Sequence, residues 1–135
     1  MNGKISVLIV APDPQVAQLL LLLLAAPDAP PRGFEPVCVE DVETGLLSLK
    51  RGGPVDAVLL GSLPDGDGAF EPLRTLRRRA PGVPVVALVE PGGEARGREA
   101  VKLGAHGYQT RERLDSRALK NALSVVVARA RLSAG

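Results

Sequence analysis

The sequence predicts a single α/β domain built on a five-stranded parallel sheet with helices on both faces. Five short apolar runs alternate with five stretches of helical pattern along the 135 residues. Two of the runs, 4–11 and 55–61, are rich in Val, Ile and Leu and stop abruptly at turn residues, as buried parallel strands do. A chain of this length can bury one substantial core but is too short for two ordinary domains. We therefore expect residues 1–135 to form one domain.

The apolar runs mark the strands. We expect strands, in chain order, over residues 5–10, 35–40, 55–60, 83–89 and 106–110. The run at 55–60 is entirely apolar after Asp56, as a central strand flanked by helices should be. Pro36 places the run at 35–40 on an edge of the sheet, because proline cannot donate a hydrogen bond to a neighbouring strand.

Helices are predicted from apolar spacing and from the residues that start and end them. We expect helices over residues 14–26, 42–51, 69–79, 94–103 and 116–132. The expected N-caps are Asp13 and Asp41 for the first two helices, Asp65 or Asp67 for the third, and Asp115 or Ser116 for the last. Gly97 lies inside the fourth helix, where it costs about 1 kcal/mol relative to alanine. That helix is therefore a candidate mobile element.

Leucine occupies six consecutive positions, 19–24, of the first expected helix. The apolar segment around them runs only from 16 to 26, which is shorter than the roughly 20 residues that a membrane span needs. We expect no membrane insertion. Leucines on every face indicate a helix that is covered on several sides, or one whose spare face meets a partner.

Strands that alternate with helices require parallel pairing and right-handed crossovers, which gives a three-layer, doubly wound sheet. The strand order 2-1-3-4-5, found in flavodoxin-like folds, would put the strand of Pro36 at one edge. In such sheets the working site lies outside the carboxyl ends of the strands, here at Ala11, Pro12, Leu60 and Gly61. None of these four side chains can act as an acid, a base or a nucleophile.

Composition excludes several classes of function. The net charge of +2 is too small to indicate a nucleic-acid partner, and the arginines at 74 and 77–79 lie near a helix end, where the helix dipole favours cations. The lone Cys38 excludes a disulfide within the chain and fits a reducing cytoplasm. The single His106 has no nucleophile at a recognisable motif, and one His with one Cys does not indicate a metal site.

Four segments, 7–14, 56–68, 84–88 and 104–108, together resemble the receiver domain of two-component response regulators in order and spacing. The resemblance extends over the chain to about residue 132. It implies a flavodoxin-like fold and a role in phosphorelay signal transduction. It also implies a pocket in which two acidic residues hold Mg²⁺ and a third, an aspartate, accepts a phosphoryl group.

The residues at the pocket positions of that family depart from its pattern. They are Ala11 and Pro12 for the two acidic residues, with Asp13 one step too late, Leu60 or Gly61 for the phospho-acceptor, Val89 for a hydroxyl residue, and Arg111 for a lysine. Two residues could occupy the acceptor position, because the loop before Pro64 is one residue shorter than in the family. Alignment from the preceding strand gives Gly61, and counting back from Pro64 gives Leu60. Tyr108 keeps the position of the family's switch aromatic.

These departures predict a pseudo-receiver that does not react with phosphate. Mg²⁺ needs hard oxygen ligands, and phosphoryl transfer needs a nucleophile and charge neutralisation, so we expect no bound metal, no cofactor and no enzymatic activity. The module would act through protein contact, as a single domain or as the amino-terminal part of a longer signalling protein. The family's docking face, made by the fourth helix, fifth strand and fifth helix, would serve a protein partner or a homodimer. It would carry Arg98, Lys102, Tyr108, Arg111, Arg113 and Arg117.

Two alternatives stay open. The emptied pocket could bind a small ligand, although no glycine-rich phosphate loop follows the first strand. A conventional receiver could use a displaced acceptor, Asp65 or Asp67, although both lie in a turn, where aspartate is expected for local backbone bonding.

Overall fold

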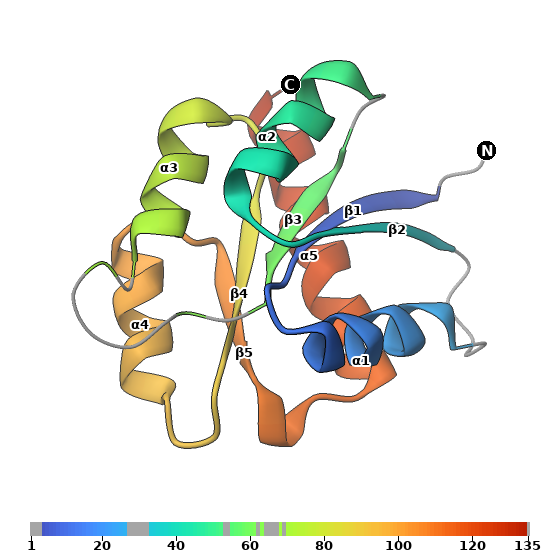
Figure 1. The fold of residues 1–135 in the computed structure, drawn as a ribbon, viewed down its shortest axis with the longest axis vertical. Coiled ribbons are helices and arrows are strands. Elements are labelled where there is room, and N and C mark those ends of the chain that lie inside the picture. The colour runs from blue at the N-terminus through green and yellow to red at the C-terminus, as the bar shows by residue number, and fades with distance from the viewer. Residues whose placement is uncertain are drawn as a thin grey trace.

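The chain forms a parallel sheet between two layers of helices in the computed structural model, which describes residues 4–26, 33–52, 55–61, 63, 68 and 70–134 (Figure 1). The strands are β1 (Ile5–Val10), β2 (Phe34–Val39), β3 (Ala57–Leu60), β4 (Val85–Val89) and β5 (Gly107–Thr110). The helices are α1 (Pro14–Ala25), α2 (Val42–Arg51), α3 (Glu71–Arg79), α4 (Glu94–Lys102) and α5 (Ser116–Ala134), with a short 3-10 turn at Arg111–Arg113.

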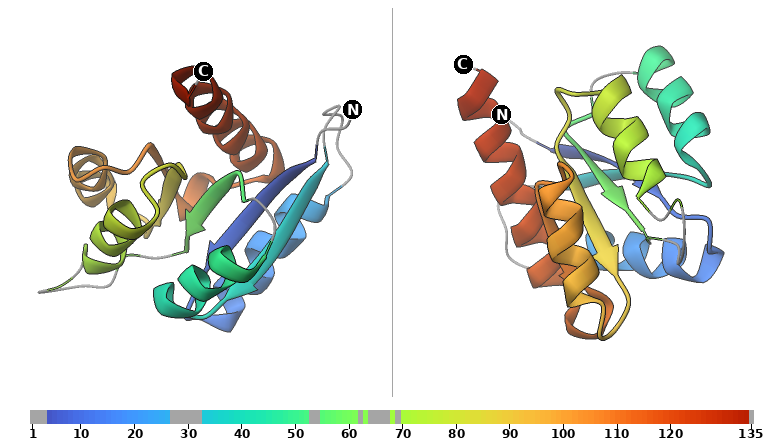
Figure 2. Two further views of the ribbon diagram at one scale, coloured as in Figure 1. Left: turned by 90° about the horizontal axis from the view of Figure 1, so that it is seen from above. Right: turned by 90° about the vertical axis from the view of Figure 1, so that its left-hand side faces the viewer.

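The strands lie in the order β2-β1-β3-β4-β5, and every pair is parallel. Helices α1 and α5 cover one face, and α2, α3 and α4 cover the other (Figure 2). The two faces carry separate apolar layers, because alternate residues of each strand point to opposite sides: Ile9 and Leu59 to the first layer, Val10 and Leu60 to the second. The predicted fold class and strand order are confirmed.

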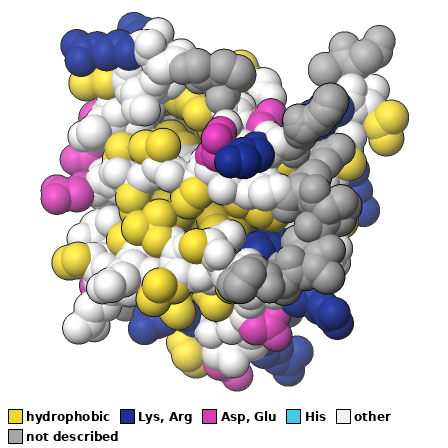
Figure 3. All heavy atoms as spheres, turned by 90° about the vertical axis from the view of Figure 1, so that its right-hand side faces the viewer, with side chains coloured by type: hydrophobic (Ala, Val, Ile, Leu, Met, Phe, Trp, Pro, Cys, Tyr) yellow, Lys and Arg dark blue, Asp and Glu magenta, His cyan; other side chains and the backbone are white. Residues whose placement is uncertain are grey.

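Strand β2 lies at the edge, as Pro36 predicted. The carbonyl oxygens of Gly33 and Val39 accept hydrogen bonds from the backbone N–H groups of Ile5, in β1, and Ala11, just after it, at 3.0 Å each. Backbone groups alternate in direction along a strand, so Pro36 lies at an outward position, where no neighbouring strand needs its missing N–H. Figure 3 shows the molecule from the right-hand side of Figure 1, with apolar side chains gathered in the middle of that face.

Helix α1 is held by the first turns of α5. Ser116 Oγ donates to the carbonyl oxygen of Leu23 at 2.7 Å, and Lys120 Nζ donates to that of Ala26 at 2.6 Å. These contacts satisfy carbonyl groups that α1 leaves free at its carboxyl end. The leucine run is therefore covered by α5 and the sheet on one side, while Leu22 on the other side is 63% exposed. No helix in the described part of the chain is long and apolar enough to cross a membrane.

Three strands, β3, β4 and β5, start later than predicted, and at the starts of β3 and β5 a side chain takes the place of a backbone partner. The carboxylate of Asp56 accepts from the backbone N–H of Ser6 at 2.9 Å, so β3 begins at Ala57. His106 Nδ1 accepts from the N–H of Val85 at 3.1 Å, so β5 begins one residue after His106.

The predicted N-cap of α3 is wrong. Asp65 and Asp67 lie outside the described residues, and the N-cap is Phe70, which makes no side-chain capping hydrogen bond. The helix begins at Glu71 because Pro72 stands in its first turn, where a missing N–H is tolerated. The other predicted caps fare better: Asp13, Asp41 and Asp115 each accept a hydrogen bond from a backbone N–H of the first helical turn.

Candidate functional site

The carboxyl ends of β1 and β3 touch each other, with no room for a side chain between them. Val10 and Leu60 are partners across the two strands, and the N–H of Gly61 donates to the carbonyl oxygen of Val10 at 2.7 Å. A Cβ atom added to Gly61 would lie 2.8 Å from the Cβ of Ala11 and 2.9 Å from that carbonyl oxygen. Any larger residue at position 61, aspartate included, would therefore require the backbone to move.

Residues 12 and 13, which follow the end of β1, lead into helix α1. Pro12 is exposed. Asp13 is the N-cap of α1, and its Oδ1 accepts from the backbone N–H of Gln15 at 2.8 Å. The carboxylate of Asp13 is thus engaged with the helix start, as the sequence predicted.

Leu60 lies on the α2–α3 side of the sheet and is 2% exposed. It is part of the wall of a cavity of about 530 Å³ at the carboxyl ends of β1, β2 and β3. The cavity is lined by Val10, Pro12, Glu40, Asp41, Val42, Glu43, Leu60 and Pro72. Leu60 and Gly61 therefore lie in different surroundings: one in this cavity, the other against β1.

Val89 lies apart from that cavity. It is buried at the end of β4 and lines a smaller cavity of about 190 Å³, together with Leu63, the loop 90–93 and Arg96. Arg96 Nη2 donates to the carbonyl oxygen of Leu63 at 3.0 Å. This hydrogen bond ties α4 to the segment that follows β3.

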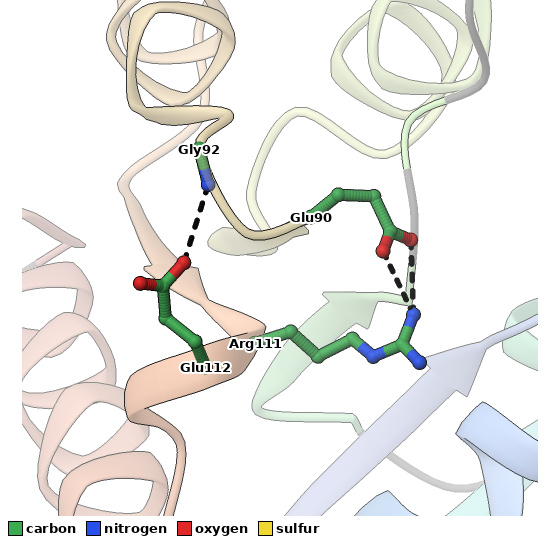
Figure 4. Close-up of polar contacts among 4 residues, drawn as sticks. All are labelled: Glu90, Gly92, Arg111 and Glu112. Atoms are coloured by element: carbon green, nitrogen blue, oxygen red, sulfur yellow. Dashed lines mark hydrogen bonds and ion pairs between the residues drawn. The ribbon is translucent and has the colours of Figure 1, made fainter.

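Arg111 reaches across the ends of β4 and β5 to Glu90 (Figure 4). Its Nη1 lies 2.9 and 3.0 Å from the two carboxylate oxygens of Glu90. Next to this ion pair, the carboxylate of Glu112 accepts from the backbone N–H of Gly92 at 3.2 Å. Both contacts join the loop after β4 to the turn after β5.

The sequence did not predict the role of Glu90 or Glu112. A signal existed, because β4 and β5 are neighbours in the predicted order and opposite charges follow both strands. Side chains at the carboxyl ends of adjacent parallel strands meet at the same edge of the sheet. The pairing of Glu90 with Arg111 could have been found from that rule.

Tyr108 is half-buried and its ring packs directly on α4. A Cβ atom added to Gly97 would overlap this ring, coming within 2.6 Å of Cε1 and closer still to the neighbouring ring atoms. The glycine inside α4 therefore has a packing role that the sequence did not reveal: it makes room for the ring of Tyr108.

The candidate interaction face has a mixed charge. Arg98, Lys102, Arg113 and Arg117 are exposed, whereas Arg111 is only half-exposed and paired with Glu90. The acidic side chains at positions 94 and 99 of α4, and at position 112 in the 3-10 turn after β5, are also exposed.

Two further groups have shifted pKa values. Burial raises the pKa of the Cys38 thiol, which makes the thiol a weaker nucleophile at neutral pH. Burial and the nearby charge of Arg77 lower the pKa of His106, against a smaller opposing effect from its hydrogen bond with Val85. Within the described ranges, no three side chains of His, Cys, Asp or Glu gather so that they could hold a metal ion.

The chain is similar to one curated regulatory protein in sequence and to several receiver domains in structure. No protein-family model matches the chain. Over 92 residues the chain is 35% identical to the photosynthetic apparatus regulatory protein RegA of Rhodobacter capsulatus; this segment is 68% of the chain and 49% of RegA. The chain thus spans about half the length of this curated relative.

Solved structures share the fold at lower identity. A response regulator receiver domain protein from Clostridium thermocellum has a TM-score of 0.75 and 19% identity, over 95% of this chain and 98% of that one. The structure described as adenylate cyclase from Rhodopirellula baltica has a TM-score of 0.76 and 18% identity, over 99% of this chain and 93% of that one. The chain therefore has the fold of response-regulator receiver domains.

Proposed function

We propose that this chain is a receiver-type signalling module that is not switched by aspartyl phosphorylation and that acts through protein contact. The contact between Ala11 and Gly61 is the observation that carries the proposal. A receiver needs carboxylates at the ends of β1 and β3; at position 61, after β3, the backbone of β1 and the methyl group of Ala11 leave no space for a side chain. With no acidic side chain there, neither a Mg²⁺ ligand nor a nucleophile is present at these positions.

The basic residue after β5 supports the same proposal. Arg111 stands where the family has a lysine, and its guanidinium is already paired with a carboxylate of the protein itself. Both side chains are partly exposed, so the pair contributes about 0.2–1 kcal/mol. Even so, Glu90 offers Arg111 a permanent anion in place of a transient phosphoryl group.

The proposed mode of action is docking on a protein partner or on a second copy through the α4–β5–α5 face. Arginine and tyrosine are enriched at binding hot spots, and the elements of this face carry the exposed Arg98, Arg113 and Arg117 and the half-buried Tyr108. RegA extends well beyond the matched segment, which supports a place for this module within a longer regulator. We place its action in the cytoplasm. The likeness to the structure described as adenylate cyclase is one of fold, and we propose no catalysis.

The experiment is incubation with Mg²⁺ and acetyl phosphate, followed by intact-protein mass spectrometry, with the Clostridium thermocellum receiver treated in parallel. We expect the control to gain a phosphoryl group and this chain to gain none. The melting temperature of this chain should be the same with and without Mg²⁺, since a ligand stabilises only a protein that binds it.

A matched variant excludes the nearest carboxylate. Asp13→Asn keeps the N-cap, because asparagine caps helices about as well as aspartate, and should change neither result. A stable acyl phosphate would overturn the proposal. Its location by peptide mapping on Asp65 or Asp67 would establish the displaced-acceptor alternative instead.

A further inference from the structure

The cavity of about 530 Å³ beside Leu60 has the size of a small-molecule site. Its base is formed by Val10 and Leu60, which are paired across β1 and β3 and are each 2% exposed. Pro12 from the end of β1, Val42 from the first turn of α2 and Pro72 from the first turn of α3 line it too. These rigid or branched apolar side chains come from four different elements, so the cavity is built by the fold and not by one loop.

The polar residues that line this cavity are all acidic. Glu40, Asp41 and Glu43 lie at exposed positions, and no lysine or arginine is among the described lining residues. Asp41 is kept ionised, because a hydrogen bond from the backbone N–H of Thr44 lowers its pKa. The carboxylate of Glu43 lies 4.0 Å from the guanidinium of Arg79, and the two side chains are 74% and 49% exposed, so this pair is weak.

These charges decide which ligand fits. An anionic ligand would meet repulsion at the mouth of the cavity, so a phosphorylated compound is disfavoured. A bare metal ion is disfavoured as well, because these carboxylates are not among any group of described side chains that could hold one. An apolar body with a positively charged amine satisfies both parts: the body would pack against the apolar lining, and the amine would lie on the side of the exposed acidic residues.

We propose that the cavity between β1, β3, α2 and α3 is a binding site for a small amphipathic organic cation, with an aromatic or branched apolar body and a protonated amine. The proposal goes beyond the signalling role, because it concerns the α2–α3 side of the strand ends, whereas protein docking concerns α4, β5 and α5. Ligand binding here would bias the positions of the first turns of α2 and α3.

The test uses three compounds of one shape: 2-(1-naphthyl)ethylamine, the neutral 1-naphthaleneethanol and the anionic 1-naphthaleneacetate. Titration of the full chain is followed by two-dimensional NMR of the backbone amides. We expect saturable shifts for the amine at Val42, Glu43 and Leu60, roughly fivefold weaker binding of the alcohol, and still weaker binding of the acid, from the modest strength of exposed ion pairs.

Variants separate the two parts of the site. Glu40→Gln with Glu43→Gln should reduce the preference for the amine over the alcohol, with Asp41 left in place as the N-cap of α2, and should leave alcohol binding unchanged. Glu94→Gln, which removes an exposed carboxylate on α4, is the matched control and should change neither. Val42→Trp should fill the cavity and weaken all three compounds, with thermal unfolding used to check that this variant folds.

The proposal is overturned if the amine gives no saturable shifts, if the shifts map elsewhere on the molecule, or if the anion binds as well as the amine. None of these outcomes bears on phosphorylation, which the mass measurement decides separately.

Discussion

Replacing Gly97 by alanine should destabilise the protein, although helix propensity alone predicts the reverse. Gly97 is inside α4, where alanine is favoured by about 1 kcal/mol. The added methyl group, however, would lie within 2.6 Å of Cε1 of Tyr108 and overlap the ring. Overpacking of this kind costs about 1–3 kcal/mol, so the clash exceeds the propensity gain in most of that range. We expect a net loss of about 1 kcal/mol.

A double-mutant cycle isolates the clash from the propensity. Tyr108→Ala removes the ring, so Gly97→Ala in that background should stabilise the protein by about 1 kcal/mol. The sign of the effect thus reverses between the two backgrounds, with a coupling of about 2 kcal/mol. Urea unfolding of the four proteins measures it. If Gly97→Ala stabilised the chain with Tyr108 in place, the packing argument would be refuted.

Three further predictions concern stability. Lys120→Met should lower the free energy of unfolding, measured in urea, by about 1–2 kcal/mol. Methionine keeps the packing of this residue, which is 7% exposed, but removes the ammonium group that donates to the carbonyl oxygen of Ala26. Asp13→Ala should cost about 1 kcal/mol through loss of the cap, in contrast to Asp13→Asn. His106 has a pKa in the folded protein below its usual 6.5, so its contribution to the free energy of unfolding is full above pH 6.5 and is lost as the pH falls through the folded pKa. His106→Gln should therefore flatten the dependence of stability on pH in that range. The prediction fails if the two proteins show the same dependence.

Local chemistry carried most of the fold prediction. Apolar runs, Asp caps and Pro36 identified the five strands, the helices and the edge strand, because these signals act within a few residues of chain. Some of the errors occurred where a distant partner matters: the side chains of Asp56 and His106 bind backbone groups of neighbouring strands where β3 and β5 begin. The start of α3 was wrong for a local reason, the position of Pro72.

The candidate site was predicted in part. The sequence named the residues at the strand ends, but it could not say which of them share a space. The structure places Gly61 against Ala11, Leu60 in one cavity and Val89 in another. It also directs Arg111 to Glu90, a pair separated by 21 residues in the chain.

The order of the elements and the lack of carboxylates at positions 11, 12, 60 and 61 follow from the sequence alone, since residue identity decides whether a carboxylate exists at all. The contacts made at those positions follow from the folded structure. Close approach of the strand ends at Gly61, the space that Gly97 leaves for Tyr108 and the acid-lined cavity beside Leu60 all depend on packing between segments distant in the chain. Such contacts are set by the dense packing of the whole molecule and leave no local pattern in the sequence.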